Sequence, residues 1–157
     1  MEKAAEISPC GRYRYTLARI WDPDLPCVAF IGLNPSTADA FQDDPTLNRC
    51  MRYAEAWGYG GVWMVNLFAF RATRPADMMA ADDPVGPDND ISLQSVCEAA
   101  DLVVAAWGNH GSFRNRSHEV RVMLDGLHCL KVNKSGEPAH PLYQRKTARP
   151  EALPHCP

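Results

Sequence analysis

Four runs of consecutive apolar residues limit how this chain can fold more than any other feature of its sequence. The runs are CVAFIGL at 27–33, GVWMVNLF at 61–68, DLVVAAW at 101–107 and LHCLKV at 127–132, and the segments between them are long enough for helices. A strand with one exposed face alternates apolar and polar residues, whereas a strand covered on both faces is apolar throughout. The pattern therefore predicts a three-layer α/β/α fold, with helices on both faces of a mainly parallel, four-stranded sheet.

Local signals place further elements around these strands. The segment 13–20 alternates apolar and polar residues and carries Arg14 and Arg19, which is typical of an edge strand. Asp44 can cap a helix in which Pro45 occupies the first turn. Helices are therefore expected near 45–57, 89–100 and 115–125.

The composition fits one globular domain that spans residues 1–157. The 157 residues are 46% apolar, and 16 Lys plus Arg against 19 Asp plus Glu give a net charge of −3. That balance excludes a generally basic nucleic-acid coat and a polybasic membrane binder, although it leaves room for a local basic patch. The segment MEKAAEISPCGRYRY contains no apolar stretch like a signal-peptide core, and no run of about 18 apolar residues occurs that could span a membrane. We therefore expect a cytoplasmic protein that binds no membrane.

The cysteines are scattered along the chain and form no C-x-x-C pair. A zinc ribbon or a redox pair would normally contain one. His118-Glu119 begins like a zinc-protease motif, but Val122 stands where the second histidine would be. The sequence therefore predicts no metal site, and it predicts mostly buried, reduced thiols at Cys10, Cys27, Cys50, Cys97, Cys129 and Cys156.

Polar residues follow the first apolar run, at the sheet edge where open α/β folds bind their ligands. Asn34 stands directly before Pro35 and is either an amide held over the sheet edge or an asparagine that ties a turn to its own backbone. Asp39, Asp43 and Asp44 follow in the same segment. One of these carboxylates can serve as an acid or base, and the alternative is that all three are solvated loop residues.

Asn66 lies near the end of the second apolar run. Its amide carries both a donor and an acceptor, so it can read the edge of a nucleobase or satisfy the backbone of a loop. Phe41, Phe68 and Phe70 lie near strand ends, where aromatic rings form either a stacking surface or part of the core.

The last third of the chain adds a histidine and several arginines. His140 lies between Pro138 and Pro141, so its ring is either held rigidly at the sheet edge to stabilise an anion or exposed on a surface loop. Arg114 and Arg116 follow the third apolar run and make this part of the chain locally basic.

Taken together, the strand-end residues resemble the uracil-DNA glycosylase superfamily. Its members carry a G-x-[D/N/A]-P motif after a core strand, an Asn that ends the next strand, a strand ending in W-G and an H-P motif after the last strand. The matching segments, within about residues 27–145, are Gly32-Leu33-Asn34-Pro35, Val65-Asn66, Ala106-Trp107-Gly108-Asn109 and His140-Pro141. The whole chain also resembles a family of small bacterial proteins of unknown function that carry NPSTAD, NLFAxRAT and HPLY motifs.

The glycosylase resemblance implies roles in bond cleavage for four residues. Asn34 would position the attacking water, with Asp39 or Asp43 as a stronger base. His140 would donate a hydrogen bond to the uracil O2, where negative charge develops.

The same resemblance implies residues that bind the base and the DNA. Asn66 would pair with the Watson–Crick edge of a flipped base, beside Leu33, while Phe41, or failing it Phe68, stacks on that base. Leu142 would fill the gap that the flipped nucleotide leaves in the duplex. The expected DNA-binding residues are Arg114, Arg116, Asn109, His110, Leu142 and Tyr143.

The implied protein is a small, monomeric uracil-DNA glycosylase of base excision repair. It would bind uracil-containing DNA and hydrolyse the N-glycosidic bond without a cofactor, releasing free uracil and leaving an abasic site. The cysteine pair of the iron–sulfur members is absent, so no cluster is predicted. Ser36 occupies the position where the most active members place a thymine-excluding tyrosine. Two alternatives remain open: hydrolysis of a free nucleoside or nucleotide, and a non-catalytic nucleic-acid-binding module.

Overall fold

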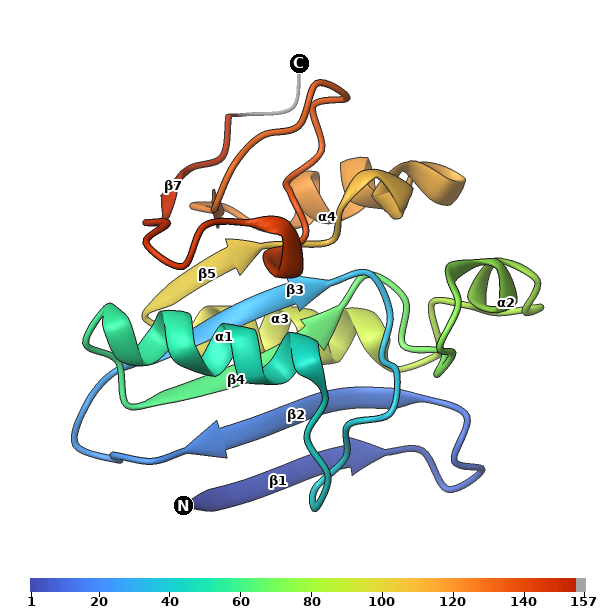
Figure 1. Ribbon diagram of the computed structural model, residues 1–157. Coiled ribbons are helices and arrows are strands. Elements are labelled where there is room, and N and C mark those ends of the chain that lie inside the picture. The colour runs from blue at the N-terminus through green and yellow to red at the C-terminus, as the bar shows by residue number, and fades with distance from the viewer. Residues whose placement is uncertain (155–157) are drawn as a thin grey trace.

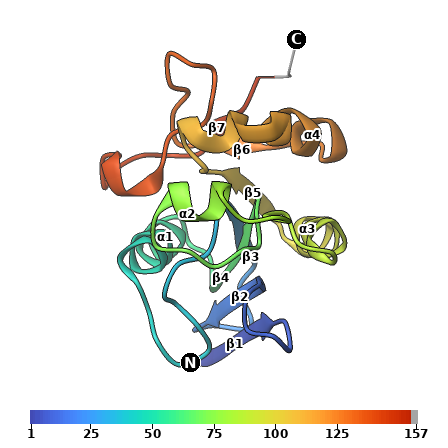
Figure 2. The same cartoon turned by 90° about the vertical axis from the view of Figure 1, so that its right-hand side faces the viewer.

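The computed structural model describes residues 1–154 and has an α/β fold. A twisted sheet runs through the centre of the molecule, with α1 on one face and α3 on the other (Figures 1 and 2). The strands are β1 (Glu2–Ile7), β2 (Arg14–Ile20), β3 (Cys27–Gly32), β4 (Gly61–Asn66), β5 (Leu102–Ala105), β6 (His128–Cys129) and β7 (Glu151–Ala152). The helices are α1 (Pro45–Ala56), α2 (Pro75–Met79), α3 (Asn89–Ala99) and α4 (Arg116–Met123), together with the 3₁₀ segments η1 (Asn109–Asn115) and η2 (Pro141–Tyr143).

The sheet is mixed and, within residues 1–154, has seven strands in the order β1-β2-β4-β3-β5-β6-β7. The four central strands, β4, β3, β5 and β6, are parallel, as the apolar runs predicted. The outer pairs β1–β2, β2–β4 and β6–β7 are antiparallel. The prediction of a mainly parallel, four-stranded sheet is therefore wrong for the sheet as a whole, because antiparallel strands extend the parallel centre on both sides.

β2 is an interior strand, so its prediction as an edge strand is wrong. β1 pairs with it on the outer side, from Glu2 opposite Ile20 onward, and β4 pairs with it on the inner side. The sequence of β1, EKAAEI, is polar and mostly exposed because this strand is itself the edge. A strand with one free edge and little burial leaves no apolar run to detect, which is why β1 was not expected.

The two faces of the sheet carry separate apolar cores. Alternate residues of β3 divide between them: Val28 and Phe30 face α1, whereas Ala29 and Ile31 face α3 and α4. This double burial is the physical reason for the continuous apolar run at 27–33.

The three predicted helices are confirmed, with ends within two residues of those expected. Asp44 caps α1 by accepting a hydrogen bond from the Leu47 amide at 2.8 Å, and Pro45 lies in the first turn. α2 was not expected, because its five residues are too few to show a helical pattern. Among residues 1–154 no helix has the length and apolar character needed to cross a membrane.

Every cysteine in the described part of the chain is a free thiol. Cys50 and Cys129 are buried, Cys27 and Cys97 are half-buried, and Cys10 is exposed. Burial raises the pKa of Cys97 to about 12 and that of Cys129 to about 11, so both stay protonated at neutral pH. Cys156 lies outside the described residues.

Candidate functional site

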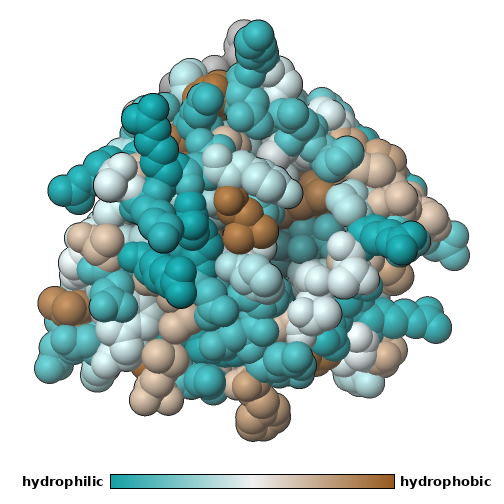
Figure 3. Space-filling view, in the orientation of Figure 1, coloured by the Kyte–Doolittle hydropathy of each residue, from teal (hydrophilic) through white to brown (hydrophobic). Residues whose placement is uncertain are grey.

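A cavity of about 610 Å³ lies at the carboxyl ends of β3, β4 and β5, between the N-terminal end of α1 and η2. Figure 3 shows a hollow at this place, next to a small hydrophobic cluster on the molecular face that carries η2. The cavity brings together eight of the residues predicted for the site: Leu33, Asn34, Asn66, Asn109, His110, His140, Leu142 and Tyr143.

Asn34 links the two loops that follow β3 and β4. Its Nδ2 donates to the carbonyl oxygens of Ala72 at 2.8 Å and Pro35 at 3.0 Å. Each hydrogen bond described for the Asn34 side chain uses Nδ2 as the donor, so Oδ1 is left as an acceptor. Asn34 therefore ties a turn and also presents a fixed carbonyl oxygen in the lining of the cavity.

Asn66 is buried at the carboxyl end of β4 and lines the cavity. A Cβ atom on Gly32 would lie only 2.8 Å from Asn66 Oδ1, so a glycine is required beside it on β3. The backbone carbonyl of Asn66 accepts a hydrogen bond from Asn89 Nδ2 at 3.0 Å, across from α3. Asn66 Nδ2 has no partner within residues 1–154, so a buried donor remains for a ligand.

His140 is half-buried and caps η2. Its Nδ1 accepts a hydrogen bond from the Leu142 amide at 3.2 Å, so the neutral ring carries its proton on Nε2. Burial lowers the pKa of His140, and the negative charge of Asp44 opposes that shift without reversing it. The imidazole is therefore a neutral Nε2–H donor at neutral pH.

Of the three carboxylates predicted as acids or bases, Asp44 lines the described part of the cavity, whereas Asp39 and Asp43 do not. Asp39 Oδ1 accepts hydrogen bonds from the Phe41 and Gln42 amides, both at 2.8 Å, and these bonds lower the pKa of Asp39. Asp39 thus stabilises its own loop. Asp44 was expected as a helix cap and as one of three candidate acids or bases, and it does line the cavity while it caps α1.

Asp43 is the ion-pair partner of a buried arginine. Arg19 is fully buried, and its Nε donates to Asp43 Oδ1 at 2.9 Å. Its other nitrogens donate to backbone carbonyls, including that of Asp39. This arginine therefore anchors the 38–43 loop to β2.

Neither phenylalanine predicted to stack on a base lies in the cavity. Phe41 is 90% exposed on the 38–43 loop. Phe68 is fully buried on the opposite face of the sheet, with its ring centroid 5.7 Å from that of Phe113. The aromatic residues that do line the cavity are Phe30, Trp107 and Tyr143.

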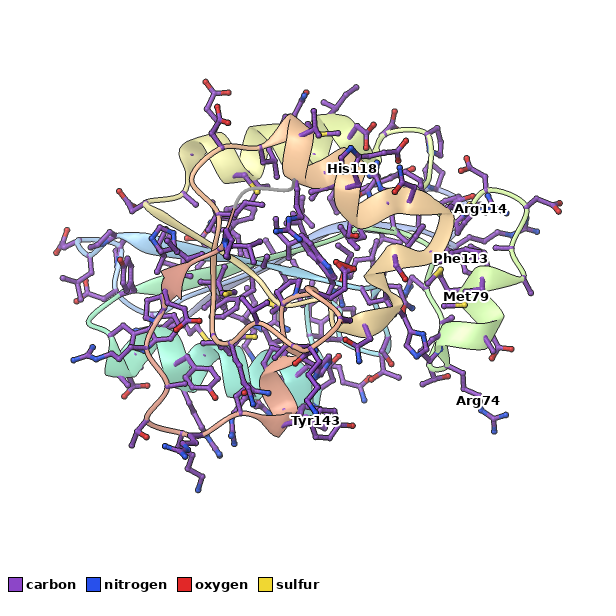
Figure 4. All side chains as sticks on the ribbon, turned by 90° about the horizontal axis from the view of Figure 1, so that it is seen from above. Arg74, Met79, Phe113, Arg114, His118 and Tyr143 are labelled. Atoms are coloured by element: carbon purple, nitrogen blue, oxygen red, sulfur yellow. The ribbon has the colours of Figure 1, made fainter. Side chains whose placement is uncertain are left out.

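The two arginines predicted to contact DNA have different surroundings. Arg116 is 3% exposed, and its guanidinium donates to the Leu67 carbonyl at 2.9 Å and pairs with Asp90 at 2.5 Å, so it is not placed to contact phosphate. Arg114 is exposed, with its guanidinium 5.3 Å from the centroid of the Phe113 ring. Figure 4 shows Arg114 on η1 and Arg74 at the start of α2 directed outward at the same end of the molecule. Arg74 directly follows the NLFAxRAT motif, which ends at Thr73, but the sequence analysis assigned it no role.

Arg14 is a charged residue of the cavity lining to which the sequence analysis assigned no functional role. It is 4% exposed, and its Nη1 donates to the Ala38 carbonyl at 2.9 Å. Burial lowers the pKa of Arg14 to about 10, with Asp44 opposing the shift, so the side chain remains charged at neutral pH. The segment 13–20 was predicted to be an edge strand, and arginines on an edge strand are expected to be exposed to solvent. For this reason nothing in the sequence indicated that Arg14 lines a cavity.

Comparison with known proteins finds one family. Residues 14–142 match the family described as "Protein of unknown function (DUF1643)". No curated protein and no solved structure matches the chain. None of these comparisons links the chain to the uracil-DNA glycosylase superfamily.

Asp43 can be tested as a structural residue. We expect Asp43→Ala to lower the free energy of unfolding by about 2 kcal/mol, because it leaves a buried guanidinium without its carboxylate while the carbonyl contacts remain. The control is Asp24→Ala at an exposed carboxylate, which should stay within about 0.5 kcal/mol of the wild type. Urea unfolding measures both variants, and equal stabilities would show that the Arg19 pair does not hold the loop.

Proposed function

The chain belongs to the DUF1643 family, and we propose that it hydrolyses the N-glycosidic bond of uracil in DNA. One observation carries the proposal: three side chains with defined hydrogen-bonding states line the same cavity at the carboxyl ends of the parallel strands. These are the Asn66 amide with its unpartnered donor, the Asn34 Oδ1 acceptor and the His140 Nε2–H donor. The cavity volume of about 610 Å³ lies in the range of small-molecule sites.

The Asn66 amide is complementary to the edge of uracil. Oδ1 can accept from the uracil N3–H, and Nδ2 can donate to O4. A bidentate contact of this kind discriminates between bases by about 1–3 kcal/mol. Gly32 leaves room for the Asn66 amide, and Asn89 holds the Asn66 backbone carbonyl, so the backbone that carries the amide is fixed before the base arrives.

Bond cleavage requires negative charge on the departing base and positive charge on the sugar to be stabilised. The His140 Nε2–H would donate to the uracil O2 as charge develops there, an interaction stronger in the transition state than in the ground state. Asn34 Oδ1 would orient the attacking water. Asp44, and not Asp39 or Asp43, would accept the proton of that water, since it is the carboxylate of the described lining.

DNA would approach through the rim of the cavity. Leu142 and Tyr143 are exposed there and would enter the duplex where the uracil leaves it. Arg114 and Arg74, directed outward at the same end, would contact phosphates in place of the buried Arg116.

Hydrolysis of a free nucleoside or nucleotide is a second candidate, favoured by the buried charge of Arg14 in the lining. In a nucleotide the anionic group is the phosphate, which an arginine can bind. This candidate needs no DNA-binding face.

The substrate assay separates these candidates. End-labelled single- and double-stranded DNA with one uracil is incubated with the purified protein and then with alkali, while deoxyuridine and dUMP are followed by chromatography. Cleavage at uracil is the expected result. Base release from the small molecules alone would favour the second candidate. Binding without release from any substrate would overturn the hydrolase proposal and leave a binding module.

The proposed catalytic residues make distinct predictions. Asn34→Ala, Asp44→Asn and His140→Gln should each slow single-turnover base release by roughly 10²–10³, the scale for loss of one preorganised catalytic contact. Asp44→Asn keeps a side-chain oxygen that can cap α1, so its melting temperature should change little. Asp39→Asn, outside the cavity, is the control and should keep the wild-type rate. Wild-type rates in all three cavity variants would exclude this mechanism.

Base preference tests the role of Asn66. Asn66→Asp should lower activity on uracil and raise activity on cytosine, because a carboxylate repels the uracil O4 and accepts from the cytosine amino group. Asn109→Asp makes the same chemical change in the lining, where Asn109 Oδ1 accepts from Asn133 and Ser135. The ratio of the two single-turnover rates should shift in the first variant only. An unchanged ratio in Asn66→Asp would remove Asn66 from base recognition.

A further inference from the structure

A β-bulge directs Arg14 into the cavity. Between β1 and β2, Glu6 pairs with Thr16 but the next residue, Ile7, pairs with Arg14, so Tyr15 is an extra residue on β2. Regular alternation would place Arg14 on the face opposite to Leu17. With the extra residue, both side chains line the cavity. Bulges commonly redirect a side chain in this way next to functional sites.

Arg14 forms no salt bridge within the described residues, although the negative charges of Asp44 and Asp39 act on it from a greater distance. The two other buried arginines, Arg19 and Arg116, each form an ion pair and each donate to backbone carbonyls. The Arg14 side chain instead has the single described bond to Ala38, and its Nε has no partner in residues 1–154. A buried charge is unfavourable unless it is paired, so this arrangement is unusual for a purely structural residue.

A second unpartnered donor of the lining lies at the same sheet edge. Besides Arg14 Nε, it is Asn66 Nδ2, as far as the lining is described; Trp107 Nε1 also has no partner but lies beside Gly111 and Glu137, which are outside the lining. Arg14 begins β2 and Asn66 ends the neighbouring antiparallel strand β4, so both donors belong to one end of the sheet. The unpartnered acceptors described elsewhere, Asn89 Oδ1 and Glu137 Oε2, belong to residues outside the lining. The group that fits this cavity is therefore rich in acceptor oxygens.

We propose that Arg14 is a phosphate-binding residue within the cavity, and that the ligand is a uracil nucleotide whose phosphate lies on Arg14 while its base lies on Asn66. The inference rests on the proposed base recognition by Asn66. β2 and β4 are neighbours, and the Arg14 amide donates to the Ala69 carbonyl at 3.0 Å. Arg14 therefore lies farther along this sheet edge than Asn66, and a phosphate and a base on these two residues would occupy different parts of one cavity. The planar guanidinium matches two phosphate oxygens at once.

The phosphate has two sources, a free nucleotide or a DNA strand, and three probes separate them. The probes are 2′-deoxypseudouridine, its 5′-monophosphate, and a single-stranded oligonucleotide that contains the same nucleoside internally. Their carbon–carbon glycosidic bond resists hydrolysis, so calorimetry measures binding alone. We expect wild-type protein to bind the monophosphate at least 10-fold more tightly than the nucleoside.

Variants of Arg14 then assign the preference. Arg14→Gln should reduce the preference for the monophosphate to below twofold, and Arg14→Lys should retain part of it. Arg12→Gln removes the same charge from an exposed residue outside the lining and should keep the full preference. If Arg14→Gln also weakens oligonucleotide binding, the strand supplies the phosphate; if it does not, the ligand is the free nucleotide. No preference in the wild type, or a full preference in folded Arg14→Gln, would overturn the proposal.

Inorganic phosphate separates this inference from the hydrolase proposal. Millimolar phosphate should raise the melting temperature of the wild type and of Arg12→Gln, but not that of Arg14→Gln, and this readout needs neither base recognition nor catalysis. The absence of a phosphate effect in a wild-type protein that releases base normally would reject the subsite alone. Retention of the effect in a protein that releases no base would reject only the hydrolase. A melting curve of Arg14→Gln without phosphate shows whether that variant is folded, and Arg14→Lys replaces it if it is not.

Discussion

The parallel hydrogen bonding of β3 on both of its edges is the interaction on which the rest of the structure depends. β3 pairs with β4 on one side and β5 on the other, while its side chains enter both apolar cores. Parallel pairing makes the three strands end at the same edge of the sheet. The residues after each strand therefore converge without any direct bond between them, and the cavity results from the strand directions more than from any one loop.

The parallel centre of the fold could be predicted from the sequence, because double burial leaves a direct signature in consecutive apolar residues. The outer strands could not, because their positions depend on which partner they find. β1 is polar and β7 has two residues, so neither carries a pattern of its own, and without β1 the alternating segment 13–20 looks like an edge.

The candidate site was predictable at the level of segments and not of individual side chains. Asn34 and His140 follow apolar runs, Asn66 lies near the end of one, and the structure brings all three to one cavity. Among neighbouring carboxylates, only the path of the loop decides that Asp44 lines the cavity while Asp43 meets Arg19. The arginines show the same limit. Arg14, Arg19 and Arg116 are chemically identical in the sequence, yet the contacts that bury them give two of them carboxylate partners and leave one in the cavity lining.

The carboxyl end of β4 is held from the side of the sheet that faces away from the cavity. Asn89 donates to the carbonyls of both Asn66 and Leu67, each at 3.0 Å, and Arg116 donates to the same Leu67 carbonyl. Three hydrogen bonds from two side chains, Asn89 on α3 and Arg116 on α4, thus fix this strand end, so a ligand would not have to order it on binding. The shape of this end of the cavity consequently depends on residues outside its lining, and a substitution that repacks α3 would move the end of β4 while leaving every lining residue unchanged.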